Sequence, residues 1–529
     1  MESDRKLLSG NEALALAALH AGITMGSGYP GTPSSEILEE FNKGGGFARW
    51  SPNEKVALEV GIGVAFAGGR ALVTMKHVGV NVAADPFFSV AYTGVDGALV
   101  IVSADDPGMS SSQNEQDNRR FAVAAGMPTI EPGDSQEAYD FFLEAVRISE
   151  TWHTAVMFRI TTRVCHSKSL VRFSAEPFTP AKPGFVRNIP GKVMIPAHAR
   201  PAHRRMRERL AKLQAWNETS TLNRIHEGDA SLGVITSGIS YVHTREAAPD
   251  ARILKLGMTY PLPYERIRAF VHSVKRCIVI EEGDPYLVES LRMNGIEVED
   301  KPEAFRFGEL NVNRVRRILV NDTSPELALK GGKPPELCAG CPHRMTFISL
   351  NRLNCIVSGD IGCYTLGALP PFEAMDSQLC MGASIGIGLG MRHALPPHEA
   401  RRVVSVIGDS TFFHSGLTGI AEMVYNPPKT GHIVLILDNG TTAMTGMQEH
   451  PGTGRSLDHM AASQILPEDV VRAMGVPNVK VVGYGRELEE TLAEAMKQDA
   501  VTVIVMRQAC RLMVVKAPAP KCDSEADDE

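Results

Sequence analysis

The chain has 529 residues, 43% of them hydrophobic and 22% charged, with a net charge of -7. These values are ordinary for a globular protein of about three domains, and the negative balance argues against nucleic acid as a partner. No apolar run approaches the roughly 18 to 20 residues that span a bilayer, and "MESDRKLLSG" lacks the apolar core of a signal peptide, so we expect a cytoplasmic protein without membrane contact.

Residues 1–180 alternate helical patterns with short apolar runs. The helical pattern of residues 54–69 is followed by apolar runs at 70–75 and 97–105. Such alternation is typical of a parallel sheet covered by helices, and it predicts a first α/β domain over residues 1–180.

Residues 181–228 interrupt this pattern with a stretch rich in Pro and Gly and then the basic stretch "ARPAHRRMRERLAKLQAWNE". We interpret the segment as a linker with a solvated, charged helix rather than as a nucleic-acid patch, because no aromatic and basic groove accompanies it. Residues 229–328 then predict a second α/β domain, with apolar strands at 231–238, 251–257 and 276–283.

A third α/β domain is expected over residues 329–515, beginning at "LKGGKPPELCAGCPHR". Its strands include "NCIVSGD", "RRVVSVIGD", "GHIVLILDN" and "VTVIVMRQ". The acidic residues 516–529 predict a disordered tail. The predicted fold class is α/β, with three doubly wound domains in series.

Two apolar strands of the third domain end in small and oxygen-bearing residues. Gly408, Asp409 and Ser410 follow one strand, and Asn439 and Gly440 follow the next, about one crossover helix later. Parallel α/β sheets bind ligands at the carboxyl ends of their strands, where Asp409 and Asn439 would suit Mg²⁺ carrying a diphosphate and the glycines would let the backbone approach it. Two ordinary turns use the same residue types, and the pattern alone leaves that alternative open.

The two motifs together resemble the fingerprint of thiamin diphosphate enzymes, which also need a glutamic acid in an apolar place against the aminopyrimidine of the cofactor. Glu54 and Glu59 stand at the start of the apolar helix predicted at 54–69. A buried acid there would need a functional partner, whereas either residue could instead complement the helix dipole.

Four of the nine cysteines occupy positions that suit a metal centre. Cys338 and Cys341 form a CxxC motif, and Cys363 and Cys510 follow apolar strands of the same domain. Four thiolates gathered there would hold a 4Fe-4S cluster or a structural zinc, and buried apolar cysteines are the alternative. We interpret the others as packing residues or, for Cys522, a tail thiol: Cys165, Cys277, Cys355, Cys380 and Cys522.

Seven long motifs spread over nearly the whole chain carry a family resemblance: "GSGYPGTPSSEI", "NEKVALEVGIG", "MKHVGVNVAADP", "SSQNEQDNRRFA", "LCAGCPHR", "SGDIGCYTLGALPPFEAMDSQLCMGASIG" and "TTAMTGMQEHPGTG". They resemble the large (alpha) subunit of indolepyruvate ferredoxin oxidoreductase, in the 2-oxoacid:ferredoxin oxidoreductase superfamily. The resemblance implies a pyrimidine-binding domain at 1–180, a transketolase-C-like domain at 229–328 and a diphosphate-binding domain at 329–515.

The resemblance also assigns residues to roles. It places the pyrimidine glutamate at Glu54 rather than Glu59, and the contact with the substrate carboxylate at Thr32. It implies Mg²⁺ ligands at Asp409, at Asn439 and at the carbonyl of Thr441. Further cofactor contacts are implied at Gly362, Cys363, Gly408, Ser410 and Thr442. The proximal 4Fe-4S cluster of related enzymes matches Cys338, Cys341, Cys363 and Cys510.

One feature departs from the family pattern. Typical members carry a C-terminal two-cluster ferredoxin module with repeated CxxCxxCxxxCP, and this sequence ends in "VVKAPAPKCDSEADDE" without it. We therefore expect electrons to leave through another subunit, another acceptor or the proximal cluster alone.

The function implied by the resemblance is oxidative decarboxylation of aryl 2-oxoacids, of the indolepyruvate and phenylpyruvate type, to acyl-CoA and CO₂. Thiamin diphosphate, Mg²⁺ and one 4Fe-4S cluster would be cofactors, with coenzyme A as cosubstrate and ferredoxin or another molecule as electron acceptor. The expected partners are a second copy of the chain and a smaller gamma-type (beta) subunit. A non-oxidative thiamin diphosphate-dependent decarboxylase or ligase and a non-catalytic scaffold stapled by zinc are the alternatives.

Three further polar residues are candidates for the chemistry. His77 and His414 could handle protons near the cofactor, or could be structural histidines. Arg119 could bind the substrate carboxylate or a phosphate of coenzyme A, or could form a surface salt bridge.

Overall fold

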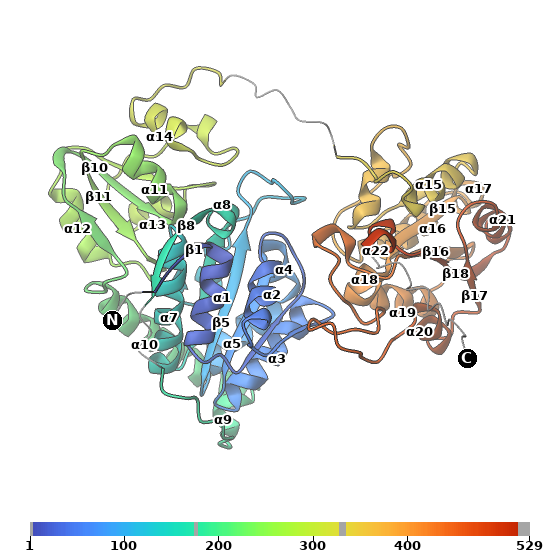
Figure 1. Cartoon of the computed structure of the whole chain (residues 1–529), viewed down its shortest axis with the longest axis horizontal. Helices are drawn as coiled ribbons and strands as arrows, with labels where there is room; N and C mark the ends of the chain where they lie inside the picture. Colours follow the sequence, from blue (N-terminus) through green and yellow to red (C-terminus); the bar gives the residue numbers. More distant parts are fainter. Residues whose placement is uncertain (1–3, 174–177, 327–334, 517–529) are drawn as a thin grey trace, which may run out of the picture. The chain divides into compact units, whose positions relative to one another are not determined.

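The computed structural model describes residues 4–173, 178–326 and 335–516 (Figure 1). The chain divides into two compact units, Met1–Ala328 and Leu329–Glu529. Cys522 and nearly all of the acidic tail expected at 516–529 lie outside the described residues.

The first unit is built on a seven-stranded sheet in the order β12-β6-β7-β5-β4-β2-β3. All neighbouring strands in it are parallel except β12, which pairs antiparallel with β6. The strands are β2 (Met25–Gly28), β3 (Ala48–Trp50), β4 (Arg70–Lys76), β5 (Ala98–Asp105), β6 (Thr129–Ile130), β7 (Val156–Thr161) and β12 (Met258–Tyr260). A separate antiparallel pair joins β1 (Asp4–Ser9) to β8 (Lys168–Phe173).

Helices cover both faces of this sheet, as the alternating sequence predicted. Gly26 of β2 faces Leu38 of one helix, while the next residue, Ser27, donates to the carbonyl of Ala57 of another helix, so successive residues point to opposite layers. The helices of the first 173 residues are α1 (Gly10–His20), α2 (Ser35–Lys43), α3 (Glu54–Phe66), α4 (His77–Val82), α5 (Ala84–Thr93), α6 (Arg119–Ala125), α7 (Ser135–Trp152) and α8 (Thr162–His166).

A four-stranded sheet in the order β13-β10-β11-β9 forms the rest of the first unit, with only β9 antiparallel. It begins earlier than the expected 229, since β9 spans Arg224–His226. Its other strands are β10 (Asp229–Ser237), β11 (Ala251–Leu256) and β13 (Cys277–Ile280), and the helices are α11 (Gly238–Ala247), α12 (Tyr264–His272), α13 (Tyr286–Met293) and α14 (Val312–Leu319).

This second sheet is tied to the first through β12 and through buried charges. Strand β12 lies between β11 and α12 in the chain and yet pairs with β6 of the seven-stranded sheet. Lys255 of β11 is 2.6 Å from the carboxylate of Glu137 on α7, and both side chains are buried. These links explain why residues on both sides of the predicted linker belong to one compact unit.

The predicted solvated helix is instead half buried. Helix α10 (Pro196–Asn217), which follows the short α9 (Ile189–Lys192), has buried residues at Ala202, Met206, Leu210 and Leu213. Met206 and Leu210 join the core formed by α3, α5 and the central strands. The spacing of about one turn between these apolar residues places them on one helix face, a signal that the high basic content obscured.

The second unit has one parallel five-stranded sheet in the order β14-β15-β16-β18-β17. Its strands are β14 (Ile356–Ser358), β15 (Val403–Gly408), β16 (Gly431–Asp438), β17 (Asn478–Val482) and β18 (Ala500–Arg507). Its helices are α15 (Pro342–Arg352), α16 (Ala383–Ala394), α17 (Pro397–Ala400), α18 (Asp409–Thr411), α19 (Leu417–Tyr425), α20 (Pro467–Ala473), α21 (Arg486–Ala495) and α22 (Arg511–Lys516).

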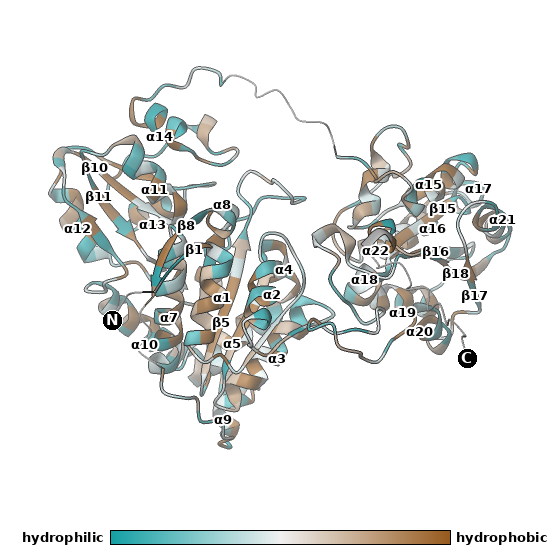
Figure 2. Cartoon of the chain, viewed as in Figure 1, coloured by the Kyte–Doolittle hydropathy of each residue, from teal (hydrophilic) through white to brown (hydrophobic). Residues whose placement is uncertain are grey.

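The predicted α/β class is confirmed in both units. In Figure 2 hydrophilic colour is prominent on helices such as α12 and α21, whereas strand β5 and helix α1 carry mostly hydrophobic colour. In the part of the chain that the structure describes, no helix is both long and apolar enough to cross a membrane.

Candidate functional site

Loops at the carboxyl ends of adjacent parallel strands gather the predicted residues of the first unit. Thr32 follows β2, Glu54 follows β3 and begins α3, and His77 follows β4 and begins α4. The loop after β5 carries the "SSQNEQDNRR" motif into α6. Because β3, β2, β4 and β5 are neighbours in this order, their loops share one edge of the sheet, which is the usual ligand-binding edge of this architecture.

Glu54 is a buried acid at the N-terminus of its helix. It is 5% exposed, and Asn53 caps the helix by accepting a hydrogen bond from the amide of Val56 at 2.9 Å. A Cβ atom placed on Gly79 of α4 would lie 2.6 Å from Oε1 of Glu54, so α4 approaches the carboxyl closely. Glu59, by contrast, is about half exposed and pairs with Lys55. Burial therefore separates the two acids that the sequence left as alternatives.

His77 is fully buried beside the loop after β5. Its Nε2 lies 3.1 Å from the carbonyl of Asn114, and its own carbonyl accepts hydrogen bonds from Gln116 and Asn118. Among the described residues, none is a hydrogen-bond partner of its Nδ1. Burial lowers the pKa of His77, which favours the neutral ring. A neutral ring with an unpaired nitrogen is able to accept a proton.

Arg119 is buried among acids of the chain itself. Its guanidinium is 2.6 Å from Asp117 and 3.0 Å from Glu281, and its side chain is 1% exposed. The alternative of a surface salt bridge is therefore wrong. A ligand carboxylate or phosphate at this residue would have to replace one of these acids, because they already meet its charge.

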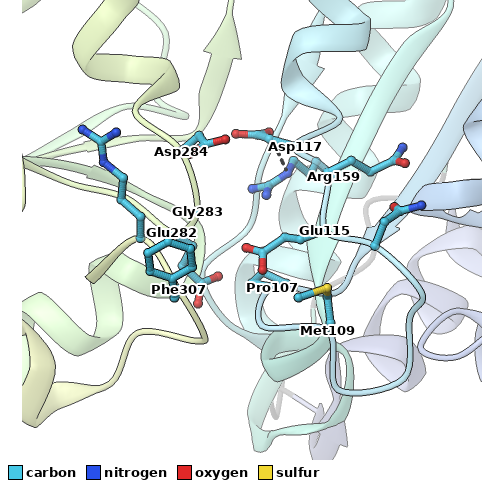
Figure 3. A pocket seen from close by; sticks show the side chains of 12 residues that line it. Pro107, Met109, Glu115, Asp117, Arg159, Glu282, Gly283, Asp284 and Phe307 are labelled. Carbon is cyan, nitrogen blue, oxygen red and sulfur yellow. Dashed lines mark ion pairs between the residues drawn. The ribbon is translucent and has the colours of Figure 1, made fainter. Parts of the chain in front are cut away.

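A cavity of about 390 Å³ adjoins this region of the first unit. Figure 3 shows Glu115 on one side, from the loop after β5, and Glu282, Gly283 and Phe307 on the other. Burial raises the pKa of Glu282 to about 7, although Arg159 opposes the shift. One wall includes Glu115 and Asp117 of the "SSQNEQDNRRFA" motif, but the sequence did not indicate the opposite wall, because Glu282 lies more than 150 residues further along the chain than this motif.

In the second unit Asp409 and Asn439 follow the adjacent strands β15 and β16. Asp409 is 2% exposed, and Asn439 is 9% exposed. Burial opposes ionisation of Asp409, but His450 and the amides of Ser410 and Gly440 hold its pKa below the ordinary value. One ionised carboxylate and one amide oxygen at neighbouring strand ends fit Mg²⁺, which prefers hard oxygen ligands and substrate phosphates.

The remaining residues implied for the diphosphate end lie around these two. The amide of Thr441 donates to Oδ1 of Asn439 at 3.0 Å, and the carbonyl of Thr441 accepts a hydrogen bond from Ala443. Thr442 donates to the hydroxyl of Ser410 at 2.8 Å, which ties the two strand ends together. These side chains thus form one polar group at the carboxyl edge of the sheet.

The two glycines of the strand-end motifs have different reasons to be glycine. Gly440 has a φ of 74°, and no atom lies within 4 Å of where its Cβ would be, which suits close approach of a ligand. A Cβ on Gly408 would lie 2.7 Å from the ring of Tyr364, and one on Gly362 would lie 2.4 Å from it. The ring of Tyr364 therefore gives Gly408 a packing reason to be glycine, while approach of a diphosphate to its backbone stays a prediction.

The four predicted cysteines line one cavity of about 80 Å³ in the second unit. Burial, followed by the charges of Cys341, Cys510 and Cys338, raises the pKa of Cys363 to about 11, as expected for thiols that lie near one another. Within the described ranges, no three Cys, His, Asp or Glu side chains are placed to hold a single metal ion. Four thiols around a small hollow are a donor set that fits an iron-sulfur cluster.

The cysteine cavity and the polar strand ends adjoin each other. Asn439 lines the cavity, and its carbonyl accepts a hydrogen bond from the amide of Cys510 at 2.9 Å. His414 follows Asp409 closely in the sequence and lies in one turn of π-helix (Phe412–Gly416). It is 2% exposed, and its Nδ1 is hydrogen-bonded to the hydroxyl of Ser415. π-turns inside helices are frequent at functional sites.

Two histidines of the second unit were not singled out from the sequence. His450 lies 3.2 Å from Asp409, and His343 lines the cysteine cavity. Burial lowers the pKa of His343 to about 4 despite the nearby charge of Asp409. Both lie within motifs that carried the family resemblance, but only their packing distinguishes them from the other residues of those motifs.

Comparison with known proteins identifies both units. The family described as "Pyruvate flavodoxin/ferredoxin oxidoreductase, thiamine diP-bdg" matches residues 16–182, and "Thiamine pyrophosphate enzyme, C-terminal TPP binding domain" matches residues 360–506. The chain is 39% identical to indolepyruvate oxidoreductase subunit IorA of Archaeoglobus fulgidus, over 98% of this chain and 88% of that protein. The subunit of the same name from Pyrococcus horikoshii is 38% identical, over 96% and 86%.

Among solved structures, 2-oxoglutarate:ferredoxin oxidoreductase from Magnetococcus marinus shares the fold, with a TM-score of 0.53 over 60% of this chain and 65% of that one at 16% identity. The 38 to 39% identity to the archaeal subunits extends over nearly the whole chain, so it supports a narrower family assignment than the shared fold does. The chain is an enzyme subunit of thiamin diphosphate-dependent 2-oxoacid oxidoreductases, and it belongs to the family of indolepyruvate oxidoreductase IorA subunits.

Proposed function

We propose that the chain catalyses the oxidative decarboxylation of aryl 2-oxoacids to acyl-CoA and CO₂. The observation that carries this proposal is the buried carboxyl of Glu54, held against Gly79 at the ligand-binding edge of the first sheet. The names of the archaeal relatives, indolepyruvate oxidoreductase, support the aryl substrate. The overall change is oxidation of the 2-oxoacid by two electrons, which pass to ferredoxin or another acceptor while coenzyme A takes the acyl group.

Thiamin diphosphate, when bound, supplies a nucleophilic carbon and accepts the electron pair that CO₂ leaves behind. Glu54 holds a proton at its carboxyl against the aminopyrimidine, where burial excludes water. Asp409 and Asn439, with the carbonyl of Thr441, hold the Mg²⁺ of the diphosphate. Gly362, Gly408, Ser410 and Thr442 surround this end of the cofactor in our proposal.

In our proposal the substrate end of the site is assigned to the loops of the first unit. Thr32 binds the carboxylate of the 2-oxoacid, and the unpaired Nδ1 of His77 accepts a proton during turnover. His414 is a second proton-handling candidate. Arg119 binds a ligand carboxylate or phosphate in this proposal only if that ligand displaces Asp117 or Glu281.

Electrons leave through the cysteine cavity in our proposal. Cys338, Cys341, Cys363 and Cys510 hold one 4Fe-4S cluster, next to Asn439 at the diphosphate end. A smaller gamma-type subunit and a second copy of the chain complete the enzyme, since two-subunit sites are common where pyrimidine and diphosphate domains meet.

The test is an anaerobic preparation with any copurifying subunits, supplied with thiamin diphosphate, Mg²⁺, coenzyme A and a one-electron dye. We expect iron and sulfide, acyl-CoA formation that requires the dye, and higher kcat/KM for indolepyruvate and phenylpyruvate than for pyruvate or 2-oxoglutarate. Preference for pyruvate or 2-oxoglutarate would refute the aryl substrate. CO₂ release without dye from an iron-free protein would favour the non-oxidative decarboxylase, and absence of cofactor binding would favour the scaffold.

A further inference from the structure

The carboxylate of Asp409 receives three N–H groups. The amide of Ser410 donates to Oδ1 at 2.9 Å, the amide of Gly440 donates to Oδ2 at 2.8 Å, and Nε2 of His450 lies 3.2 Å from Oδ2. Two of these donors come from the strand ends themselves. His450 comes from the long loop after β16 and is the one side chain among the three.

The tautomer of His450 follows from its second contact. The amide of Gly452 donates to Nδ1 of His450 at 3.1 Å. A ring nitrogen that accepts a hydrogen bond carries no proton, so in the neutral ring the proton is on Nε2 and is donated to Asp409. His450 therefore bridges the backbone of its own loop and the predicted magnesium ligand.

Packing leaves the His450 ring little freedom to turn. The His450 side chain is 3% exposed, and its ring lies against Phe413, with ring centroids 6.0 Å apart. A Cβ on Gly452 would lie 2.9 Å from the imidazole and 3.0 Å from the Phe413 ring, so glycine is needed for this close fit. The orientation of the donor is thus set before any ligand binds.

Counting acceptor positions shows which oxygen is left for a cation. An ionised carboxylate offers about four lone-pair directions, two on each oxygen. On Oδ2, Gly440 and His450 take both, whereas Oδ1 accepts from the amide of Ser410. The carboxyl of Asp438 also lies close to Asp409, and burial followed by the charge of Asp409 raises the pKa of Asp438. Oδ1 is therefore the oxygen of Asp409 with fewer N–H donors and the one more open to a cation.

We propose that His450 is a positioning residue of the cofactor site, which fixes the orientation of the Asp409 carboxylate that would hold the Mg²⁺ of a bound diphosphate. This inference rests on the proposed function, because it assigns Asp409 to the metal. It predicts that His450 acts on metal affinity rather than on the chemical step. It also gives a physical role to the histidine of the "QEHPGTG" segment, which the motif alone did not explain.

The test is calorimetry of Mg²⁺ binding at saturating thiamin diphosphate, on the full chain with any copurifying subunits. For His450→Phe, which fills the site without a donor, we expect the Kd for Mg²⁺ to rise roughly 10- to 100-fold, as for loss of one hydrogen bond to a charged group. His450→Gln keeps an N–H and should lose less than about tenfold. His459→Gln is the control, since His459 is 77% exposed in the same loop and pairs with Glu449.

A kinetic readout separates positioning from a structural defect. At saturating Mg²⁺ the kcat of His450→Phe should return to within about twofold of the wild-type value, because only metal affinity is lost. An unchanged or lower Kd for Mg²⁺ in a folded His450→Phe would overturn the inference, as would a kcat that excess Mg²⁺ does not restore. Failure of the wild-type protein to bind thiamin diphosphate with Mg²⁺ would instead overturn the proposed function.

Discussion

Substitution of Gly79 by alanine tests whether the position of the Glu54 carboxyl controls activity. The new Cβ would lie 2.6 Å from both Cγ and Oε1 of Glu54 and 2.9 Å from Cδ. Ordinary contact begins at about 3.4 Å, so the carboxyl has to move by about 0.8 Å or more. Because this carboxyl is the flexible end of the Glu54 side chain, it will move before helices α3 and α4 do.

The expected loss follows from that displacement. Misplacement of a reacting group by about 1 Å costs on the order of 100-fold in rate, so we expect kcat/KM to fall roughly 10- to 100-fold in Gly79→Ala. Alanine is favoured over glycine inside a helix by roughly 0.5 to 1 kcal/mol, which offsets part of the crowding in α4. Thermal stability should therefore change little while activity falls.

The assay is dye-linked turnover, accompanied by a thermal melt and by calorimetry of thiamin diphosphate binding. Gly63→Ala is the matched control, because Gly63 lies in α3 with Glu54 and no atom lies within 4 Å of its Cβ position. A folded Gly79→Ala whose kcat/KM stays within about twofold of the wild-type value would refute the reasoning, since the displacement would then be immaterial.

Three more outcomes are expected. Glu54→Gln should lower kcat at least about 100-fold by removing a carboxyl group that is able to hold and release a proton, whereas Glu59→Gln should keep activity within about twofold, and the reverse result would contradict the assignment. Cys338→Ser should remove iron and dye-linked turnover but leave thiamin diphosphate binding unchanged, with the exposed Cys380→Ser as control. The raised pKa of Glu282, about 7 against an ordinary 4.5, makes its contribution to stability complete below about pH 4.5 and lost as the pH rises through about 7. From denaturant titrations at pH 4.5 and 8, wild-type protein should lose about 3 kcal/mol of unfolding free energy relative to Glu282→Gln, and parallel profiles would refute this.

Periodicity in the chain was enough to predict the class of fold. The apolar runs at 70–75, 97–105 and 403–408 appear as β4, β5 and β15. They were recognisable because strands that are buried on both faces consist almost entirely of apolar residues. The prediction of a solvated helix at α10 was wrong, because the many basic residues around its narrow apolar face made the helix look fully exposed in the sequence. Pairing of β12 with the first sheet was also beyond local pattern, since it depends on segments more than 120 residues apart.

Of the candidate site, the sequence by itself determined which residue types stand at the strand ends, and hence the Mg²⁺ and diphosphate interpretation. Only the tertiary structure decided which acid is buried, that Tyr364 occupies the space beside Gly408, that Arg119 is enclosed by acids and that His450 meets Asp409. The physical reason is that strand ends are local features encoded by neighbouring residues. Burial and hydrogen-bond partners depend instead on segments that meet only when the chain is folded.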